Sequence, residues 1–157
     1  MKINYDKKKI ARAVAIVYAL GVLCLLFFLF CFQSRVTVMD VSGCQAPDER
    51  MVYKIEKLEG VQGYITIEGY AYEKGQSIQT AGVSVLAYDG EKDVYYKLPT
   101  EVEVREELSE QVGDGHDYSS AGFRAVVSHK KLRHGDKIYL WYGSNGKNIL
   151  IPTESVY

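Results

Sequence analysis

The sequence contains few cysteines, three in 157 residues, and their positions limit what can hold the fold together. Cys24 and Cys31 lie inside a long apolar run, where a free thiol behaves as a small apolar side chain. Cys44 is the single thiol beyond that run, so no disulfide can form within the rest of the chain. That part must fold by burying its own core, with Cys44 as an unpaired thiol or as a link to another chain.

The sequence also lacks an excess of charge of either sign, because 19 basic residues face 20 acidic ones. Residues 1–12 hold five of the bases and one acid, which leaves fourteen bases and nineteen acids in the remainder. That mildly acidic remainder has no concentrated basic patch, which excludes nucleic acid as a partner.

Recognisable chemistry is scarce as well: the sequence shows no nucleophile motif, no metal-ligand cluster and no phosphate-binding loop. The best candidate for a site is Asp114-Gly115-His116-Asp117, a glycine-containing loop with two carboxylates and an imidazole. Calcium loops need more oxygen ligands at alternating positions. The sequence therefore predicts a solvated turn here, with no catalytic residue, no metal and no cofactor.

What the sequence does contain is an apolar run over residues 13–32, AVAIVYALGVLCLLFFLFCF, without a charge, an amide or a proline. A helix of about 20 residues is roughly 30 Å long, the thickness of the hydrocarbon core of a bilayer. The run has no polar stripe to face water, so it predicts a single transmembrane helix over residues 13–33. Gly21 is isolated and the end of the run is bulky, which favours a plain anchor over packing with other helices.

The flanks of this run predict its orientation. Arg35 is the only basic residue close behind it, and the bases before it are Lys2, Lys7, Lys8, Lys9 and Arg12. Basic residues stay on the cytoplasmic side of a membrane span. We therefore expect residues 1–12 to form a cytoplasmic tail at the cell membrane, with the C-terminal domain extracytoplasmic.

Two alternatives to an uncleaved anchor stay open. A cleaved signal peptide has a shorter apolar region that ends at a small-x-small site, whereas this run is long and is followed by Gln33-Ser34-Arg35. Val41-Ser42-Gly43-Cys44 resembles a lipoprotein cleavage box, which would lead to lipidation at Cys44. Arg35 and Asp40 would then be stranded in or near the membrane, which is costly.

The chain after the run divides into a connector and a domain. Residues 34–49 include SGCQAPDE, which is rich in turn-forming residues and predicts a juxtamembrane connector. Residues 50–157 are enough for one domain. Alternating apolar and polar side chains predict strands at residues 49–58, 62–72, 82–88, 94–98, 101–105, 122–128, 137–142 and 148–151. The first of these also has apolar residues at helical spacing, so a helix is the alternative there.

Turn signals separate these strands. Asp89-Gly90 predicts one turn, Ser144-Asn145-Gly146-Lys147 predicts a tight hairpin, and residues 106–112 predict a single helical turn. Many short strands with closely spaced turns are typical of an all-β protein. The predicted fold class is an antiparallel, immunoglobulin-like β-sandwich preceded by one transmembrane helix.

Four segments suggest a family: Ile65-Thr66-Ile67-Glu68-Gly69-Tyr70-Ala71, Arg105-Glu106-Glu107-Leu108, Ala121-Gly122-Phe123-Arg124-Ala125 and residues 132–140. This set resembles a pattern in accessory β-sandwich domains of bacterial cell-surface proteins, which often occur beside polysaccharide or glycosyltransferase machinery. Tyr70 stands where that pattern has tryptophan, and Glu107 where it has aspartate. The resemblance implies a surface role and transfers no catalytic residue.

The aromatic side chains suggest where a ligand would bind. Eleven of the 13 tyrosines lie beyond the apolar run, as does Trp141. Tyr64, Tyr70 and Tyr72 share one side of one predicted strand, where rings form a flat platform for sugars or for a protein. The predicted ligand-binding residues are therefore Tyr64, Tyr70, Tyr72 and Trp141. The alternative is that this side of the strand packs against a second layer as core.

The sequence thus predicts a single-pass, membrane-anchored, non-catalytic binding or assembly module outside the cytoplasm. Its expected partner is an envelope polysaccharide, or a protein of the membrane or the cell surface. The alternative function is a small membrane-anchored surface hydrolase that uses the loop from Asp114 to Asp117.

Overall fold

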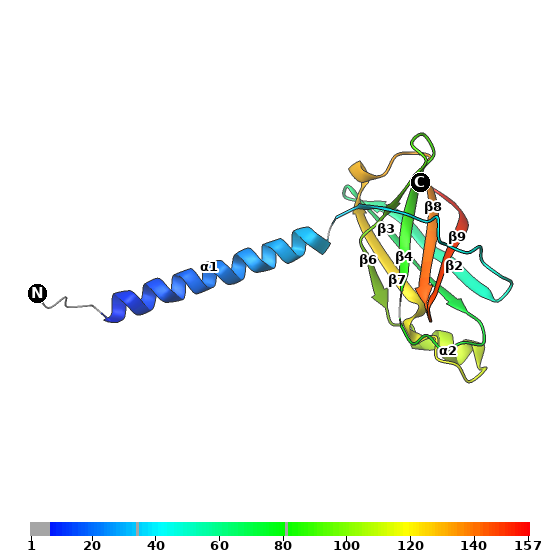
Figure 1. The fold of residues 1–157 in the computed structure, drawn as a ribbon, viewed down its shortest axis with the longest axis horizontal. Helices are drawn as coiled ribbons and strands as arrows, with labels where there is room; N and C mark the ends of the chain where they lie inside the picture. The colour runs from blue at the N-terminus through cyan, green and yellow to red at the C-terminus, as the bar shows by residue number, and fades with distance from the viewer. Residues whose placement is uncertain (1–6, 34, 81) are drawn as a thin grey trace, which may run out of the picture. The chain divides into compact units, whose positions relative to one another are not determined.

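The computed structural model describes residues 7–33, 35–80 and 82–157. The chain divides into two compact units, of which the first ends at Arg35 and the second is Val36–Tyr157 (Figure 1). Each unit is described separately below.

The first unit is built on helix α1, Lys7–Gln33. Its stretch Lys7–Leu29 is long and apolar enough to cross a membrane, and none of that stretch is buried within the structure. The helix begins earlier than the predicted residue 13, because Lys and Arg are good helix formers and extend the apolar run in the N-terminal direction. The prediction of one N-terminal helix of membrane-spanning length is confirmed.

The second unit consists mostly of antiparallel strands in two sheets. The five-stranded sheet has the order β1-β5-β4-β8-β9, and the four-stranded sheet has the order β2-β3-β7-β6. The strands are β1 (Thr37–Met39), β2 (Met51–Val61), β3 (Tyr64–Glu73), β4 (Val83–Asp89), β5 (Val94–Lys97), β6 (Thr100–Glu103), β7 (Gly122–Ser128), β8 (Lys137–Ser144) and β9 (Lys147–Val156). Every predicted strand coincides with one of these, and the two-sheet, all-β prediction is confirmed.

One core joins the two sheets. Ile65 and Ile67 of β3 belong to the same buried cluster as Val85 of β4 and Leu140 of β8. The predicted alternation on β3 therefore places its isoleucines against the other sheet, as a period of two requires. The resemblance segment that contains Phe123 and Ala125 also lies in this core.

The turn at the β8–β9 hairpin forms as predicted. Asn145 and Gly146 adopt φ values of 53° and 77°, the left-handed pair that a tight hairpin needs. The turn after β4 differs in detail, because the positive φ falls on Asp93 and not on Gly90. Asp89 instead closes this turn by accepting hydrogen bonds from the backbone N–H groups of Glu91 and Lys92, at 3.1 and 3.3 Å.

A second, smaller core covers part of the outer side of the four-stranded sheet. Helix α2 (Glu106–Val112), which the sequence predicted, and the short 3₁₀ turn η1 (Ser119–Ala121) pack there. The buried residues of this cluster are Tyr72, Leu108, Tyr118 and Ala121. Arg105 fixes the start of α2 through ion pairs with Glu107 and, at 2.9 Å, with Glu56 of β2.

The predicted connector is part of the fold. β1 pairs with β5 at one edge of the five-stranded sheet, and Gln45 forms a bridge with Ile149 of β9 at the other edge. Residues 40–45, here called the strap, therefore run from edge to edge across the sheet, and Figure 1 shows this segment passing over the strands. The folded unit begins at Val36 and not at the predicted residue 50.

Candidate functional site

The three tyrosines predicted as a platform have different surroundings. Tyr72 is 7% exposed and its ring lies 4.5 Å from that of Tyr118, inside the smaller core. Tyr70 is partly buried against the same core, with its ring 6.1 Å from that of Tyr72. Tyr64 is 57% exposed. The packing that the sequence analysis kept as an alternative therefore holds for Tyr72, and only Tyr64 offers an open ring.

Trp141 lies on the other sheet. It alternates on β8 with Leu140 and Tyr142, which point into the core, so the indole faces outward. The ring covers Gly143, where any Cβ atom would collide with it. The strap reaches this indole too, because the Trp141 N–H donates to the Cys44 sulfur. Burial raises the pKa of the Cys44 thiol and outweighs the lowering by this hydrogen bond. The four predicted ligand-binding residues thus do not form one site.

A different set of aromatic side chains does converge, on the same outer face as Trp141. The rings of Tyr88 and Tyr95 lie 4.7 Å apart, and the ring of Tyr139 lies 5.9 Å from Tyr88 and 5.2 Å from Tyr95. All three are partly exposed. We call Tyr88, Tyr95 and Tyr139 the tyrosine cluster. It comes from strands β4, β5 and β8, which are adjacent in the sheet.

Neighbouring side chains hold the tyrosine cluster in place. Leu86 precedes Tyr88 by two residues on β4, so it lies on the same face, and it is fully buried there. The Tyr88 hydroxyl donates to Asp93 Oδ1 at 2.9 Å, and this hydrogen bond raises the pKa of Tyr88. Burial raises the pKa of Tyr95. Both phenols are therefore neutral hydrogen-bonding groups at physiological pH.

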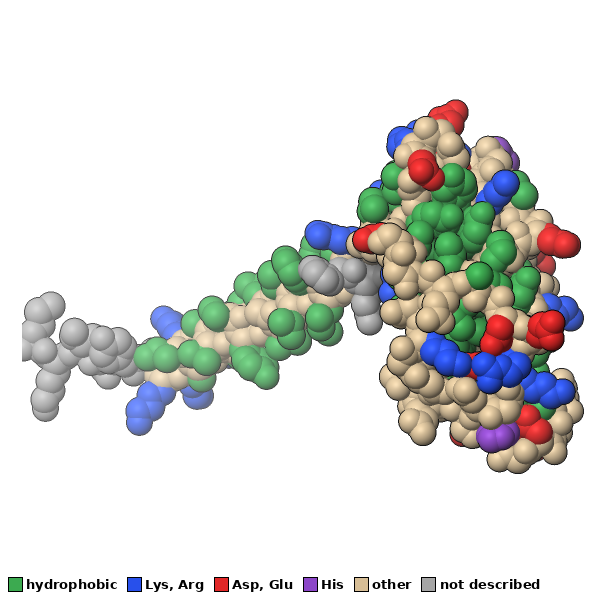
Figure 2. Space-filling model, turned by 45° about the vertical axis from the view of Figure 1, so that its right-hand side comes forward, with side chains coloured by type: hydrophobic (Ala, Val, Ile, Leu, Met, Phe, Trp, Pro, Cys, Tyr) green, Lys and Arg blue, Asp and Glu red, His purple; other side chains and the backbone are tan. Residues whose placement is uncertain are grey.

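Two lysines lie beside the tyrosine cluster on this outer face. Lys137 of β8 is exposed and lies in register with Tyr88. Lys97 lies beside the tyrosine cluster on β5 and places its ammonium group 5.4 Å from the Trp141 ring. Such a contact is attractive because the face of an indole ring is electron-rich. Figure 2 shows basic and acidic side chains next to one another on the face drawn, with hydrophobic side chains between them. The face drawn therefore has no extended patch of purely positive or purely negative charge.

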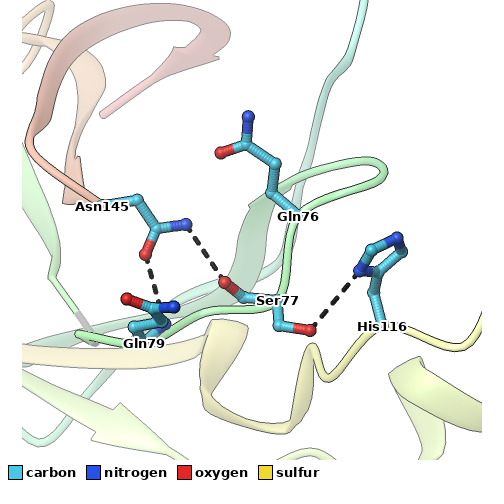
Figure 3. A pocket seen from close by; sticks show the side chains of 5 residues that line it. All are labelled: Gln76, Ser77, Gln79, His116 and Asn145. Atoms are coloured by element: carbon cyan, nitrogen blue, oxygen red, sulfur yellow. Dashed lines mark hydrogen bonds between the residues drawn. The ribbon is translucent and has the colours of Figure 1, made fainter.

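The loop from Asp114 to Asp117 lies at one end of the folded unit, beside an open hollow of about 470 Å³. Five polar residues line this hollow: Gln76, Ser77, Gln79, His116 and Asn145 (Figure 3). They come from the β3–β4 loop, the loop after α2 and the tip of the β8–β9 hairpin. The sequence analysis singled out the middle loop alone, because nothing in one sequence shows which loops meet in space.

The loop after α2 is fixed by a buried tyrosine. Tyr118 is fully buried, its hydroxyl donates to Asp114 Oδ2 at 2.7 Å, and the Gly75 N–H donates to that hydroxyl at 2.7 Å. The hydrogen bond from Tyr118 lowers the pKa of Asp114. The Ser119 N–H donates to the Asp117 carboxylate at 2.9 Å and lowers the pKa of Asp117. Both carboxylates are therefore ionised, and their hydrogen bonds stabilise the loop.

The neighbouring ion pair ties the hairpin tip to β3. Glu73 is only 1% exposed, and its two carboxylate oxygens accept hydrogen bonds from Lys147 Nζ at 2.7 and 2.6 Å. Arg50 adds a further contact to Glu73 at 2.9 Å and is itself paired with Asp48 at 2.8 Å. The short contacts of this buried carboxylate with Lys147 and Arg50 therefore hold the hairpin tip against β3.

The hollow contains one pair with the composition of a nucleophile and a base, Ser77 and His116. Ser77 Oγ lies 3.5 Å from His116 Nδ1, which exceeds the usual 2.6–3.2 Å for such a pair. Ser77 Oγ also accepts the Asp117 N–H at 2.9 Å, so its structural role is to fix the loop. Within the described residues no carboxylate hydrogen-bonds to the His116 ring. The surface hydrolase stays a prediction without a geometric argument of its own.

Comparison of the chain with protein-family models, with curated proteins and with solved structures finds no match.

Proposed function

We propose that this protein is a single-pass membrane-anchored module whose folded unit lies outside the cytoplasm and binds an envelope polysaccharide. The observation that supports this proposal best is the tyrosine cluster on the outer face of the five-stranded sheet. The platform predicted on β3 is thereby moved to the opposite sheet, where Trp141 already lies.

The tyrosine cluster suits a sugar chain for two reasons. Aromatic rings pack against the C–H faces of sugars, while phenol hydroxyl groups at the rim hydrogen-bond to sugar hydroxyls. The rings are also fixed by their neighbours, so little side-chain entropy is lost when a ligand binds. Lys97, whose ammonium group lies 5.4 Å from the Trp141 ring, extends the same face and offers a cation for an acidic group.

The anchor and its orientation belong to the same proposal. The described part of the basic tail includes Lys7, Lys8, Lys9 and Arg12 at the start of α1, which favours a cytoplasmic N-terminus. The two-sheet arrangement supports an immunoglobulin-like sandwich. The resemblance to accessory domains of bacterial cell-surface proteins points to the same role beside polysaccharide machinery.

The proposal is tested with the full-length chain in a detergent that has no sugar head group. Immobilised envelope polysaccharide should retain the wild-type protein, and Tyr139→Ala and Tyr95→Ala should each weaken binding about tenfold or more. Tyr64→Ala is the matched control, because it removes an exposed ring from the other sheet. Thermal unfolding of each variant shows whether it is folded.

Retention of a membrane or surface protein, with no retention on polysaccharide, would replace the proposed ligand by a protein partner. Equal affinities of the wild type and both cluster variants would remove the tyrosine cluster from the proposal.

A further inference from the structure

The hollow at the loop end of the folded unit is separate from the tyrosine cluster. It is lined by Gln76, Ser77, Gln79, His116 and Asn145, none of which lies on the outer face of the five-stranded sheet. It has a volume of about 470 Å³ and is open to solvent.

The walls of the hollow are fixed before any ligand arrives. The Asn145 side chain bridges two loops, because Nδ2 donates to the Ser77 carbonyl at 3.1 Å and Oδ1 accepts the Gln79 N–H at 3.2 Å (Figure 3). A third loop is joined by the Ile78 N–H, which donates to the Asp117 carbonyl at 2.9 Å. A site with a fixed backbone loses little conformational entropy on binding.

The side chains inside the hollow retain free hydrogen-bonding capacity. Among the described residues, no hydrogen bond is made by the side-chain amide of Gln76 or of Gln79. Each amide offers two donors and one acceptor oxygen, and His116 adds a ring nitrogen that is not the one facing Ser77. Figure 3 shows these side chains around the same space. Amide groups of this kind pair with adjacent hydroxyl groups, which both donate and accept.

The charged side chains near the hollow already make other contacts. Asp114 is hydrogen-bonded to Tyr118, and Asp117 to the N–H of Ser119. Lys147 is paired with the buried Glu73. The residues that line the hollow include neither an acidic side chain nor a lysine or arginine. An anionic ligand would find no compensating cation, and the amides favour a neutral one.

We infer that this hollow is a second binding site, which takes a neutral, hydroxyl-rich ligand such as a terminal unit of a saccharide. The Gln76 and Gln79 amides and the His116 ring hydrogen-bond to its hydroxyl groups, while Asn145 holds the loops that present them. This site stands independently of the tyrosine cluster, because the two share no residue.

Three neutral trisaccharides, maltotriose, cellotriose and chitotriose, serve as probes with the full-length protein in a detergent without a sugar head group. Saturation-transfer NMR should detect binding of at least one, and calorimetry should give a dissociation constant of about 1 mM or tighter. The Gln76→Ala/Gln79→Ala double variant should weaken this binding about tenfold or more, because it removes both free amides.

Two further variants make the result decisive. Tyr139→Ala changes the other site and should leave trisaccharide binding unchanged. Asn145→Gly removes the side chain that bridges the loops, so it should weaken binding. The protein should stay folded, because glycine tolerates the positive φ at this position. The inference is overturned if none of the probes binds at about 10 mM, or if binding is lost in Tyr139→Ala and retained in the double glutamine variant. The first result leaves the polysaccharide proposal standing, and the second assigns the saccharide to the tyrosine cluster.

Discussion

At the scale of single residues, three tyrosines with the same orientation on one strand have three different environments. Tyr64, Tyr70 and Tyr72 all point away from the main core, as the period of two predicts. Only Tyr72 is buried, because α2 and η1 cover that end of β3 and leave Tyr64 in solvent. The side of a strand can be predicted from its own sequence, whereas the element that covers it cannot.

This difference gives a direct prediction for stability. Tyr72→Ala should lower the free energy of unfolding by about 3 kcal/mol or more, because it removes a buried ring that packs on Tyr118. Tyr64→Ala should change it by less than about 0.5 kcal/mol, because that ring is largely exposed. Thermal or urea unfolding of the two variants against the wild type measures both values. Equal losses in the two variants would contradict the burial described for Tyr72.

The convergence of Tyr88, Tyr95 and Tyr139 was beyond the reach of sequence analysis for a related reason. Each lies on a predicted strand, but their contact depends on which strands are neighbours and on the register between them. The buried ion pair of Glu73 with Lys147 likewise joins residues 74 positions apart. By contrast, the Asn145-Gly146 hairpin was predictable, because its signal is local.

At the scale of elements, the strap shows how a polar segment can belong to a fold. Residues 34–49 look like a connector because β1 has only three residues and the rest is rich in turn formers. Residues 36–49 are instead held in the fold by long-range contacts. The Gln45 N–H donates to the Asn148 carbonyl at 2.8 Å, and the Gln45 carbonyl accepts the Leu150 N–H at 3.0 Å.

Removing β1 and the strap together should therefore weaken the folded unit. We expect a soluble chain of residues 36–157 to melt at a temperature higher by about 5 °C or more than a chain of residues 50–157, which lacks β1 and the bonds of Gln45. Trp141 reports the change as well, because it is the only tryptophan and loses its contact with Cys44. Its fluorescence should shift to longer wavelength in the shorter chain. Indistinguishable melting curves and spectra would mean that β1 and the strap add nothing to the fold.

At the scale of the whole molecule, the anchor and the folded unit follow different rules. Helix α1 is predictable from composition and length alone, because a membrane span requires about twenty apolar residues whatever their order. In the folded unit the strands β2–β9 were predictable from alternation, whereas β1 was not. Their order, and hence which loops and which tyrosines meet, was set by pairing between distant segments.

The orientation across the membrane is the last prediction, and it decides whether an envelope ligand can reach the protein at all. In a chain with Cys44→Ser, Glu154→Cys places a thiol at an exposed position of β9, and Lys2→Cys places one in the basic tail. A membrane-impermeant maleimide added to intact cells stripped of any outer wall should label Glu154→Cys at once and Lys2→Cys only after permeabilisation, because basic flanks stay in the cytoplasm. The Cys44→Ser chain without an added thiol controls for labelling of Cys24 and Cys31 within α1. Labelling of Lys2→Cys before Glu154→Cys would invert the topology and would place both proposed sites in the cytoplasm, where an envelope polysaccharide does not occur.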